Sequence, residues 1–314
     1  MSSVSPAARA PLGVLAAVLL FAAGAALAAA RVAVTLNPAA LYPEGPLLRA
    51  GTLYYAEMGA DRVSAWDGQA NRIVWTRPGC GPTSVADGGG GTLLVLCHRL
   101  NAVARITLAG ETREIVSRDA GGRPFVNPNA SINDAKGGTY FSSSGIFAPH
   151  APAEGAVLYI DAGGRVTRVA EDIHYANGVA LTADGGTLYV SEHLARRVLA
   201  FTVGADGRLS DQRDFVALDA VETLPRNHGW ELGPDGLAVD REGNVYIAEY
   251  GAGHLLIVGP NGKLRATIPV GEPYVTAMAL SPDETEIYVT APRSFFDAKA
   301  PGKVYRLPNP VAGD

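Results

Sequence analysis

Hydrophobic and polar residues alternate along this chain in short runs that recur at a nearly constant spacing. Six such runs, in which aromatic or aliphatic residues alternate with small or polar ones, start at Gly51, Gly91, Gly138, Gly186, Gly243 and Thr285. Successive starts are separated by 40, 47, 48, 57 and 42 residues. Alternation with a period of two is typical of β-strands, and a repeat of this length is typical of propeller blades. The pattern therefore predicts an all-β, six-bladed β-propeller.

Each repeat contains the material for four strands. A lead-in strand ends in an Asp/Gly-rich turn, an alternating aromatic strand follows, and two shorter strands complete the unit. The last repeat ends after its third strand, whereas residues 31–36 form a strand-like run that belongs to no blade. We expect this N-terminal strand to join the last blade and close the ring, giving one domain over residues 31–309.

Two further features of the sequence concern the loops at the tunnel end and the packing between blades. Insertions at residues 142–154 and 219–232 lengthen two connections, and we expect both to lie near one end of the tunnel and to cover it, or else to be surface loops. Tyrosine recurs at one repeat position, which favours packing between blades over catalysis: Tyr54, Tyr140, Tyr189, Tyr246 and Tyr288.

The N-terminus has the features of a secretory signal peptide. An apolar run over residues 11–30 follows Arg9 and contains the Ala26-Leu27-Ala28 cleavage pattern, so we expect residues 1–28 to be removed. An uncleaved membrane anchor is the alternative, because about 20 apolar residues can span a bilayer. If the segment is cleaved, the protein is expected in the periplasm or outside the cell. If the segment is retained, it would anchor the protein to a membrane.

Charge and cysteine content narrow the possible partners. The formal net charge is −5, or −6 without Arg9, which argues against nucleic-acid binding. Cys80 and Cys97 would lie close together on antiparallel strands, so export allows a disulfide, although two small buried thiols would fit the same positions. The sequence does not indicate an oligomeric state.

A polar residue stands near the start of every lead-in strand, seven to nine residues before its repeat start. These six residues should face the tunnel axis: Glu44, Thr83, Asn129, Asn177, Asp235 and Thr276. Burying carboxylates and carboxamides without a partner in the protein interior costs free energy. A hard divalent cation accepts the oxygens of both groups as ligands. We therefore predict one cation held by Glu44, Asn177 and Asp235, with Asn129 beside it. Calcium is expected, with magnesium, manganese or zinc as alternatives, and a merely water-filled tunnel is the other interpretation.

Four local strings resemble the family that contains gluconolactonase, senescence marker protein and luciferin-regenerating enzyme. They are residues 42–46 (YPEGP), 127–129 (NPN), 175–179 (YANGV) and 233–237 (GPDGL). The resemblance implies a six-bladed propeller with one divalent metal, and many members hydrolyse sugar lactones. It carries the metal ligands over to Glu44, Asn177 and Asp235, and a substrate-contacting asparagine over to Asn129. The family often has Arg and Asp where this chain has Asn127 and Ala130, a difference that bears on the choice of substrate and on the shell of the metal.

These observations predict an exported, metal-dependent carboxylic ester hydrolase that acts on a lactone, with a sugar-acid lactone as the expected substrate. A metal would polarise the carbonyl, and Asp235 would serve as ligand and general base. Asn129, His98 and His193 are the expected substrate contacts, although each histidine could be an ordinary polar residue at a strand end. The ends of the second strands should supply the rest of the pocket: Glu57, His98, Ser143, His193 and Glu249.

Two other functional classes remain open. A propeller of this kind could bind a ligand or a protein without catalysis, or it could be a strictosidine-synthase-like enzyme. The set of Glu44, Asn177 and Asp235 favours the hydrolase over the strictosidine-synthase-like enzyme, whereas lactone turnover by an Asp235→Ala variant would separate the hydrolase from a binding protein.

Overall fold

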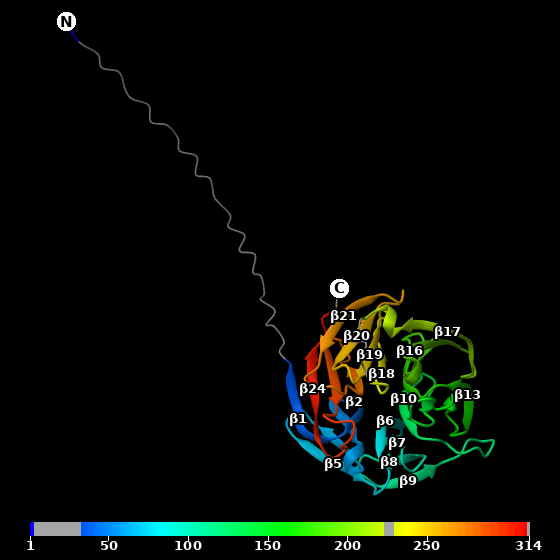
Figure 1. Cartoon of the computed structure of the whole chain (residues 1–314). Coiled ribbons are helices and arrows are strands. Elements are labelled where there is room, and N and C mark those ends of the chain that lie inside the picture. Colours follow the sequence, from blue (N-terminus) through cyan, green and yellow to red (C-terminus); the bar gives the residue numbers. More distant parts are fainter. Residues whose placement is uncertain (3–32, 223–228, 313–314) are drawn as a thin grey trace. The chain divides into compact units, whose positions relative to one another are not determined.

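The computed structural model describes residues 1–2, 33–222 and 229–312, and Figure 1 shows it. The chain divides into two units, residues 1–31 and 32–314. The second unit contains six four-stranded antiparallel sheets, so the predicted six-bladed propeller is confirmed. Apart from its first two residues, the predicted signal peptide lies outside the described residues.

Each blade is built from strands in sequence order, with the innermost strand first, except that the N-terminal strand β1 forms the outermost strand of blade 6. Blades 1 to 3 consist of β2 (Pro43–Arg49), β3 (Thr52–Glu57), β4 (Arg62–Trp66) and β5 (Asn71–Thr76); β6 (Pro82–Gly89), β7 (Thr92–Cys97), β8 (Ala102–Thr107) and β9 (Thr112–Val116); and β10 (Pro128–Asn133), β11 (Thr139–Ser143), β12 (Gly155–Ile160) and β13 (Val166–Ile173). Blades 4 to 6 consist of β14 (Ala176–Leu181), β15 (Thr187–Glu192), β16 (Arg197–Val203) and β17 (Leu209–Ala217); β18 (Gly233–Val239), β19 (Val245–Tyr250), β20 (His254–Val258) and β21 (Leu264–Pro269); and β22 (Ala277–Leu280), β23 (Glu286–Ala291), β24 (Pro301–Pro308) and β1 (Val34–Leu41).

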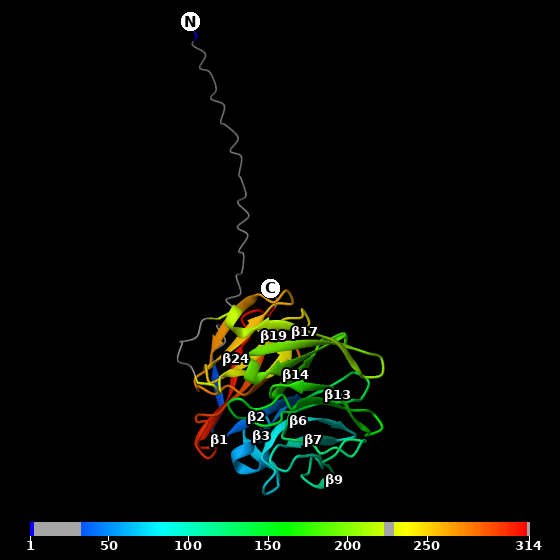
Figure 2. The ribbon, with the colours of Figure 1, turned by 45° about the vertical axis from the view of Figure 1, so that its right-hand side comes forward.

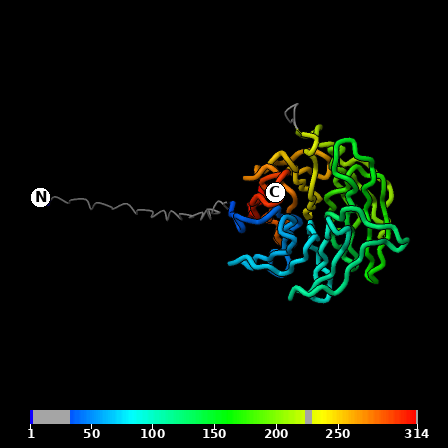
Figure 3. The backbone as a smooth tube through the Cα atoms, turned by 60° about the horizontal axis from the view of Figure 1, so that its bottom comes forward, coloured from blue at the N-terminus to red at the C-terminus, as the bar shows by residue number. Residues whose placement is uncertain are grey.

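The N-terminal strand closes the ring. Strand β1 pairs antiparallel with β24 as the outermost strand of blade 6, and the two lie side by side at the blue and red ends of the colour scale (Figure 1). This confirms the predicted closure, although the strand covers residues 34–41 instead of 31–36. At the centre, each innermost strand contacts the next, as β2 and β6 do in Figure 2, and β22 returns to β2. The end-on trace in Figure 3 follows the same circuit.

Hydrophobic side chains fill the spaces between neighbouring blades. Six buried clusters occur, one for each pair of adjacent blades, because the alternating strands present apolar residues on both faces of every sheet. Tyr54, for example, packs with Leu93 and Val95 of the next blade. All five recurring tyrosines belong to such clusters, so their predicted packing role is confirmed.

The remaining features are local. Cys80, just before β6, forms a disulfide with Cys97 at the end of β7, which settles the question that the sequence left open. Three one-turn 3-10 helices, η1 (Met58–Ala60), η2 (His193–Ala195) and η3 (Leu218–Ala220), are the helical elements of the described residues. In that part of the chain, no helix has the length and hydrophobicity required to span a membrane.

Candidate active site

The predicted inner-ring residues surround one cavity of about 250 Å³ at the tunnel end where the innermost strands begin. Five of the six equivalent positions line it and are buried: Glu44, Thr83, Asn129, Asn177 and Asp235. Thr276 does not line the cavity, because its hydroxyl donates to backbone carbonyls within blades 1 and 6 instead. His98 and His193 also line the cavity, so the structure brings together all six residues predicted for the site.

Backbone geometry directs the polar side chains inward. In four blades, the residue two positions before the inner-ring residue adopts a positive φ, which turns the chain into the innermost strand: Tyr42 (50°), Gly81 (52°), Asn127 (54°) and Tyr175 (61°). Immediately after or beside the inner-ring residue, the ladder to the second strand is interrupted in five blades. Such bulges re-aim a side chain out of the regular ladder.

Glycine follows the inner-ring residue in three blades because neighbouring strands approach closely there. A Cβ on Gly178 would lie 2.2 Å from the backbone oxygen of Asp235, and one on Gly45 would lie 2.3 Å from the backbone oxygen of Thr83. Only a residue without a side chain fits between these backbones. The Glu-Gly, Asn-Gly and Asp-Gly pairs of the sequence therefore combine a ligand-type side chain with the spacing that lets the strands converge.

The two acids of the ring are buried without a compensating cation. Burial and the nearby Asp235 carboxylate raise the pKa of Glu44 well above its ordinary value, and burial raises the pKa of Asp235 in the same direction. No lysine, arginine or histidine of the described residues forms an ion pair with either acid. Two like charges in a buried site are unfavourable, so this arrangement calls for a positive ligand.

A histidine orients the carboxamide of Asn177, which lines the same cavity as these acids. The Nε2 of His193 lies 2.8 Å from the backbone oxygen of Glu231, which can only accept, so Nε2 carries the proton. Burial lowers the pKa of His193 to about 4, so its Nδ1 is an acceptor and takes a hydrogen from Asn177 Nδ2 at 3.2 Å. This fixes the Asn177 Oδ1 atom on the side of the carboxamide opposite Nδ2. There Oδ1 is buried and has no hydrogen-bond partner among the described residues.

These residues fit a hard divalent cation. Two carboxylates and an unpartnered carboxamide oxygen are the donor set that calcium, magnesium and manganese take in proteins. A bound cation would neutralise the acids and give Asn177 Oδ1 the partner that it lacks. Since both ring nitrogens of His193 are engaged by the protein, this residue can touch a substrate only through its ring face.

The other expected substrate contacts keep open polar atoms. His98 Nδ1 lies 3.2 Å from the backbone oxygen of Pro128 and donates to it, which leaves Nε2 as an acceptor, and burial lowers the pKa of this histidine to about 4. The carboxamide of Asn129 makes no hydrogen bond to a described residue and borders the same cavity. Both side chains are therefore available to a bound molecule.

Aromatic residues that sequence reasoning missed complete the cavity. Tyr42 and Tyr250 also line it, and their hydroxyl oxygens are 2.6 Å apart. Burial raises both pKa values, so both groups stay protonated and one hydroxyl hydrogen is left to donate elsewhere. Tyr42 and Tyr175 each stand two residues before an inner-ring residue, a shared offset that could have identified them. Phe147 comes from the first predicted insertion, which is therefore placed at the tunnel end as expected.

The expectation for the second-strand ends is only partly correct. His98 and His193 line the cavity, whereas Glu57, Ser143 and Glu249 do not. Glu57 accepts hydrogen bonds from Arg62 and from the backbone of Leu41. Its side chain therefore anchors the neighbouring turn and does not reach the cavity.

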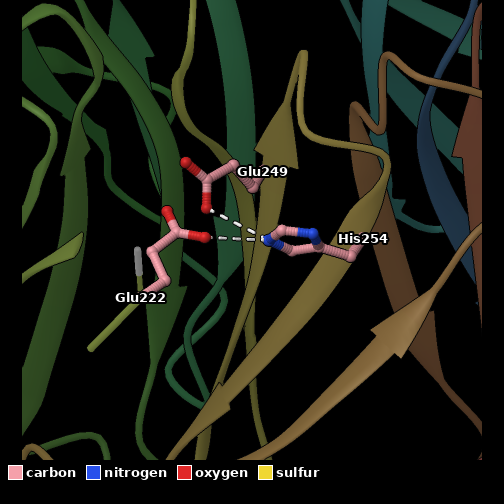
Figure 4. A group of neighbouring side chains, drawn as sticks. All are labelled: Glu222, Glu249 and His254. Atoms are coloured by element: carbon pink, nitrogen blue, oxygen red, sulfur yellow. Dashed lines mark hydrogen bonds and ion pairs between the residues drawn. The ribbon is translucent and has the colours of Figure 1, made fainter. Parts of the chain in front are cut away.

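Glu249 belongs to a separate charged cluster, shown in Figure 4. His254 Nε2 lies 3.0 Å from Glu222 and 3.4 Å from Glu249, and Arg196 bonds both acids at 3.0 and 2.9 Å. The hydrogen bonds to Glu222 and Glu249 raise the pKa of His254 to about 9. The three side chains are close enough to hold a metal, which would have to displace the proton that the two acids stabilise on His254. We assign the cluster a structural role, because it ties the segment after η3 to blade 5.

Comparison with known proteins provides an independent test of the fold and the family. A family profile described as the SMP-30/Gluconolactonase/LRE-like region matches residues 42–293. Lactonase drp35 of Staphylococcus aureus (strain bovine RF122 / ET3-1) is 32% identical over 143 residues, which are 45% of this chain and 40% of the relative. The match thus spans less than half the length of that curated relative.

Solved structures share the complete fold. XC5397 of Xanthomonas campestris, described as a gluconolactonase, has a TM-score of 0.71 and 24% identity, with coverage of 88% of this chain and 89% of that one. Regucalcin of Agrobacterium tumefaciens strain C58, described as a calcium-binding protein, has a TM-score of 0.72 and 19% identity, with coverage of 87% and 92%. At these identities the likeness shows a common architecture.

Proposed function

Because this chain belongs to the SMP-30/gluconolactonase/LRE-like family, we propose that it hydrolyses a lactone with the help of one divalent cation held by Glu44, Asn177 and Asp235. One observation carries the proposal. Two buried acids without a counter-cation among the described residues border one cavity together with an amide oxygen that has no hydrogen-bond partner there. The lactonase relative supports the reaction class, and the calcium-binding neighbour supports calcium as the cation.

A cation in this site would polarise the lactone carbonyl and stabilise negative charge on its oxygen. The residues of the chain supply the remaining chemistry. Asp235 accepts a proton from the attacking water, whose oxygen forms a bond to the carbonyl carbon. The ring C–O bond then breaks, the alkoxide takes up the proton, and the product is an open-chain hydroxy acid. Asn129 donates a hydrogen bond that positions the lactone, and the hydroxyl pair of Tyr42 and Tyr250 offers one further donor.

We also propose that the protein is exported and works in the periplasm or outside the cell. The apolar N-terminal run and its Ala-x-Ala pattern support this, and so does the Cys80–Cys97 disulfide, since disulfides persist in oxidising compartments. N-terminal sequencing of protein recovered from the expressing cell tests it. A mature chain that begins after Ala28 is expected, and a chain that retains residues 1–28 contradicts cleavage.

The catalytic proposal is tested by lactone turnover after chelation and readdition of single metals. Asp235→Asn keeps the size of the side chain but removes the ligand charge and the base, so the rate should fall by about 100-fold or more. Asp184→Asn is the matched control, because Asp184 lies in the β14–β15 turn at the opposite end of blade 4 from Asn177 and is exposed. An Asp235→Asn protein with the wild-type rate, or full activity in the chelated protein, would refute the proposal.

A further inference from the structure

Polar and apolar groups are segregated along the depth of the cavity. Its buried polar residues, such as Glu44, Asn177 and Asp235, are at most 7% exposed. Phe147 and Phe295 also line it, but they are only half-buried and therefore lie nearer to solvent. A polar interior beneath an aromatic entrance is the opposite of the usual preference for apolar interiors and polar surfaces.

Three loops from different blades build this entrance. Phe147 lies between β11 and β12, Phe295 between β23 and β24, and Trp230 just before β18. Their rings meet, with centroids 5.0 Å apart for Phe147 and Trp230, 5.9 Å for Phe147 and Phe295, and 6.2 Å for Trp230 and Phe295. Trp230 nevertheless remains 41% exposed. Aromatic groups left half-exposed beside a cavity indicate a surface that an apolar partner covers.

Few hydrogen-bonding groups remain for a polyhydroxylated ligand. If Glu44, Asn177 and Asp235 hold the cation, the open groups are the Asn129 carboxamide, His98 Nε2 and the one free hydroxyl hydrogen of the Tyr42–Tyr250 pair. The Thr83 hydroxyl is already donated to Pro128 at 3.1 Å. Arg99 reaches the cavity but is turned toward Asp61 at 3.3 Å. A sugar-acid lactone carries a hydroxyl on most ring carbons, and each one buried without a partner would cost binding energy.

We propose that the substrate is a lactone that carries an apolar alkyl or aryl substituent, instead of the sugar-acid lactone that the sequence suggested. This inference rests on the proposed lactone hydrolysis. The ester group occupies the polar interior next to Asn129 and Asp235, and the substituent packs against the cavity-facing sides of Phe147 and Phe295, where its burial contributes to binding in proportion to the apolar area covered.

A series of δ-lactones with one ring size tests the inference. The probes are δ-valerolactone, its 6-pentyl and 6-phenyl derivatives, and glucono-δ-lactone, assayed as kcat/KM with calcium present. The 6-substituted lactones should exceed δ-valerolactone by about tenfold or more, which corresponds to about 1.4 kcal/mol, and glucono-δ-lactone should be the poorest. Phe147→Ala and Phe295→Ala should each reduce the preference for the substituent by about tenfold, whereas Phe147→Leu should retain most of it.

Phe296→Ala is the matched control. Phe296 follows Phe295 directly, is 89% exposed and does not line the cavity, so its loss should leave the preference unchanged. Binding of the products to Asp235→Asn protein gives a readout that needs no turnover, and 5-hydroxydecanoate should bind at least tenfold more tightly than gluconate.

The possible failures separate the two claims. Asp235-dependent turnover that favours glucono-δ-lactone would overturn the substrate class and leave lactone hydrolysis standing. No turnover of any lactone, together with no preference in product binding, would overturn both. If Phe296→Ala reduced the preference for the substituted lactones as much as Phe295→Ala does, contact with the cavity would not explain the effect of Phe295. That result would also overturn the inference.

Discussion

Replacing Glu44 by Gln should have opposite consequences with and without a divalent cation. In the metal-free protein this change removes one of two buried like charges, whose repulsion is worth about 2–4 kcal/mol at roughly 4–8 Å and an effective dielectric constant of 20. Part of that gain is offset by the amide hydrogens, which need partners. We therefore expect Glu44→Gln protein in EDTA to match the wild type or to exceed it by about 1–3 kcal/mol.

With calcium the order should reverse. A ligand at 100 times its Kd stabilises the folded state by about 2.7 kcal/mol, or roughly 5–10 °C in Tm for a domain of this size. Without the Glu44 charge, the calcium-dependent gain should fall below about 1 kcal/mol. The assay is thermal unfolding followed by circular dichroism, in EDTA and across a calcium titration.

The matched control is Glu57→Gln in the same blade. Glu57 is fully buried but already bonded to Arg62 and Ser64, so its neutralisation should cost about 1–3 kcal/mol in both conditions. If Glu44→Gln instead lowers Tm in EDTA as Glu57→Gln does, and if calcium stabilises both variants as it does the wild type, then Glu44 is not a ligand and the reasoning fails.

Three other perturbations test separate parts of the structure. Gly178→Ala places a Cβ against the Asp235 backbone oxygen, so it should lower the free energy of unfolding by about 1–3 kcal/mol and weaken calcium binding. Unchanged unfolding and calcium titration curves would contradict the close approach. Reduction of the Cys80–Cys97 disulfide, whose ends are 17 residues apart, should cost about 3 kcal/mol in urea unfolding, and an unchanged midpoint would argue against the pairing. The pKa of His254 is raised from 6.5 to about 9, so the stability it contributes is complete below pH 6.5 and is lost as pH rises through 9. His254→Gln should remove about 1–2 kcal/mol of that pH dependence, after allowance for screening, and an unaltered pH profile of the variant would contradict the ion-pair cluster.

Repeat spacing was sufficient to predict the propeller, because each blade has the same strand order and the same inward-facing position. Equivalent positions in a closed ring must converge on its axis, so Glu44, Asn177 and Asp235 could be grouped although they lie far apart in sequence. The closing role of the N-terminal strand followed from the missing fourth strand of the last repeat, with an error of a few residues in its bounds.

Side-chain orientation within the repeats could not be read in the same way. Glu57, His98 and Glu249 occupy similar repeat positions, yet only the histidine faces the cavity, because the acids pair with arginines such as Arg62 and Arg196. The aromatic entrance was predicted only in part. Trp230 lies in the second predicted insertion, which was expected to cover the tunnel. Phe295 lies in a loop outside the repeating pattern, where periodicity gives no information about which residues meet in space.

The pairing of β1 with β24 joins the first described strand of the chain to the last. Val34 pairs with Arg306, a contact of very high sequence separation, and such contacts slow folding because the intervening chain must be ordered first. Until β24 is synthesised, β1 has no sheet to join, and the apolar faces around Leu53 and Tyr55 that meet blade 6 stay open to water. A chain that ends before residue 301 would therefore form an incomplete ring, with exposed apolar surfaces that are prone to aggregation. Strand β24 is thus required for solubility as well as for activity.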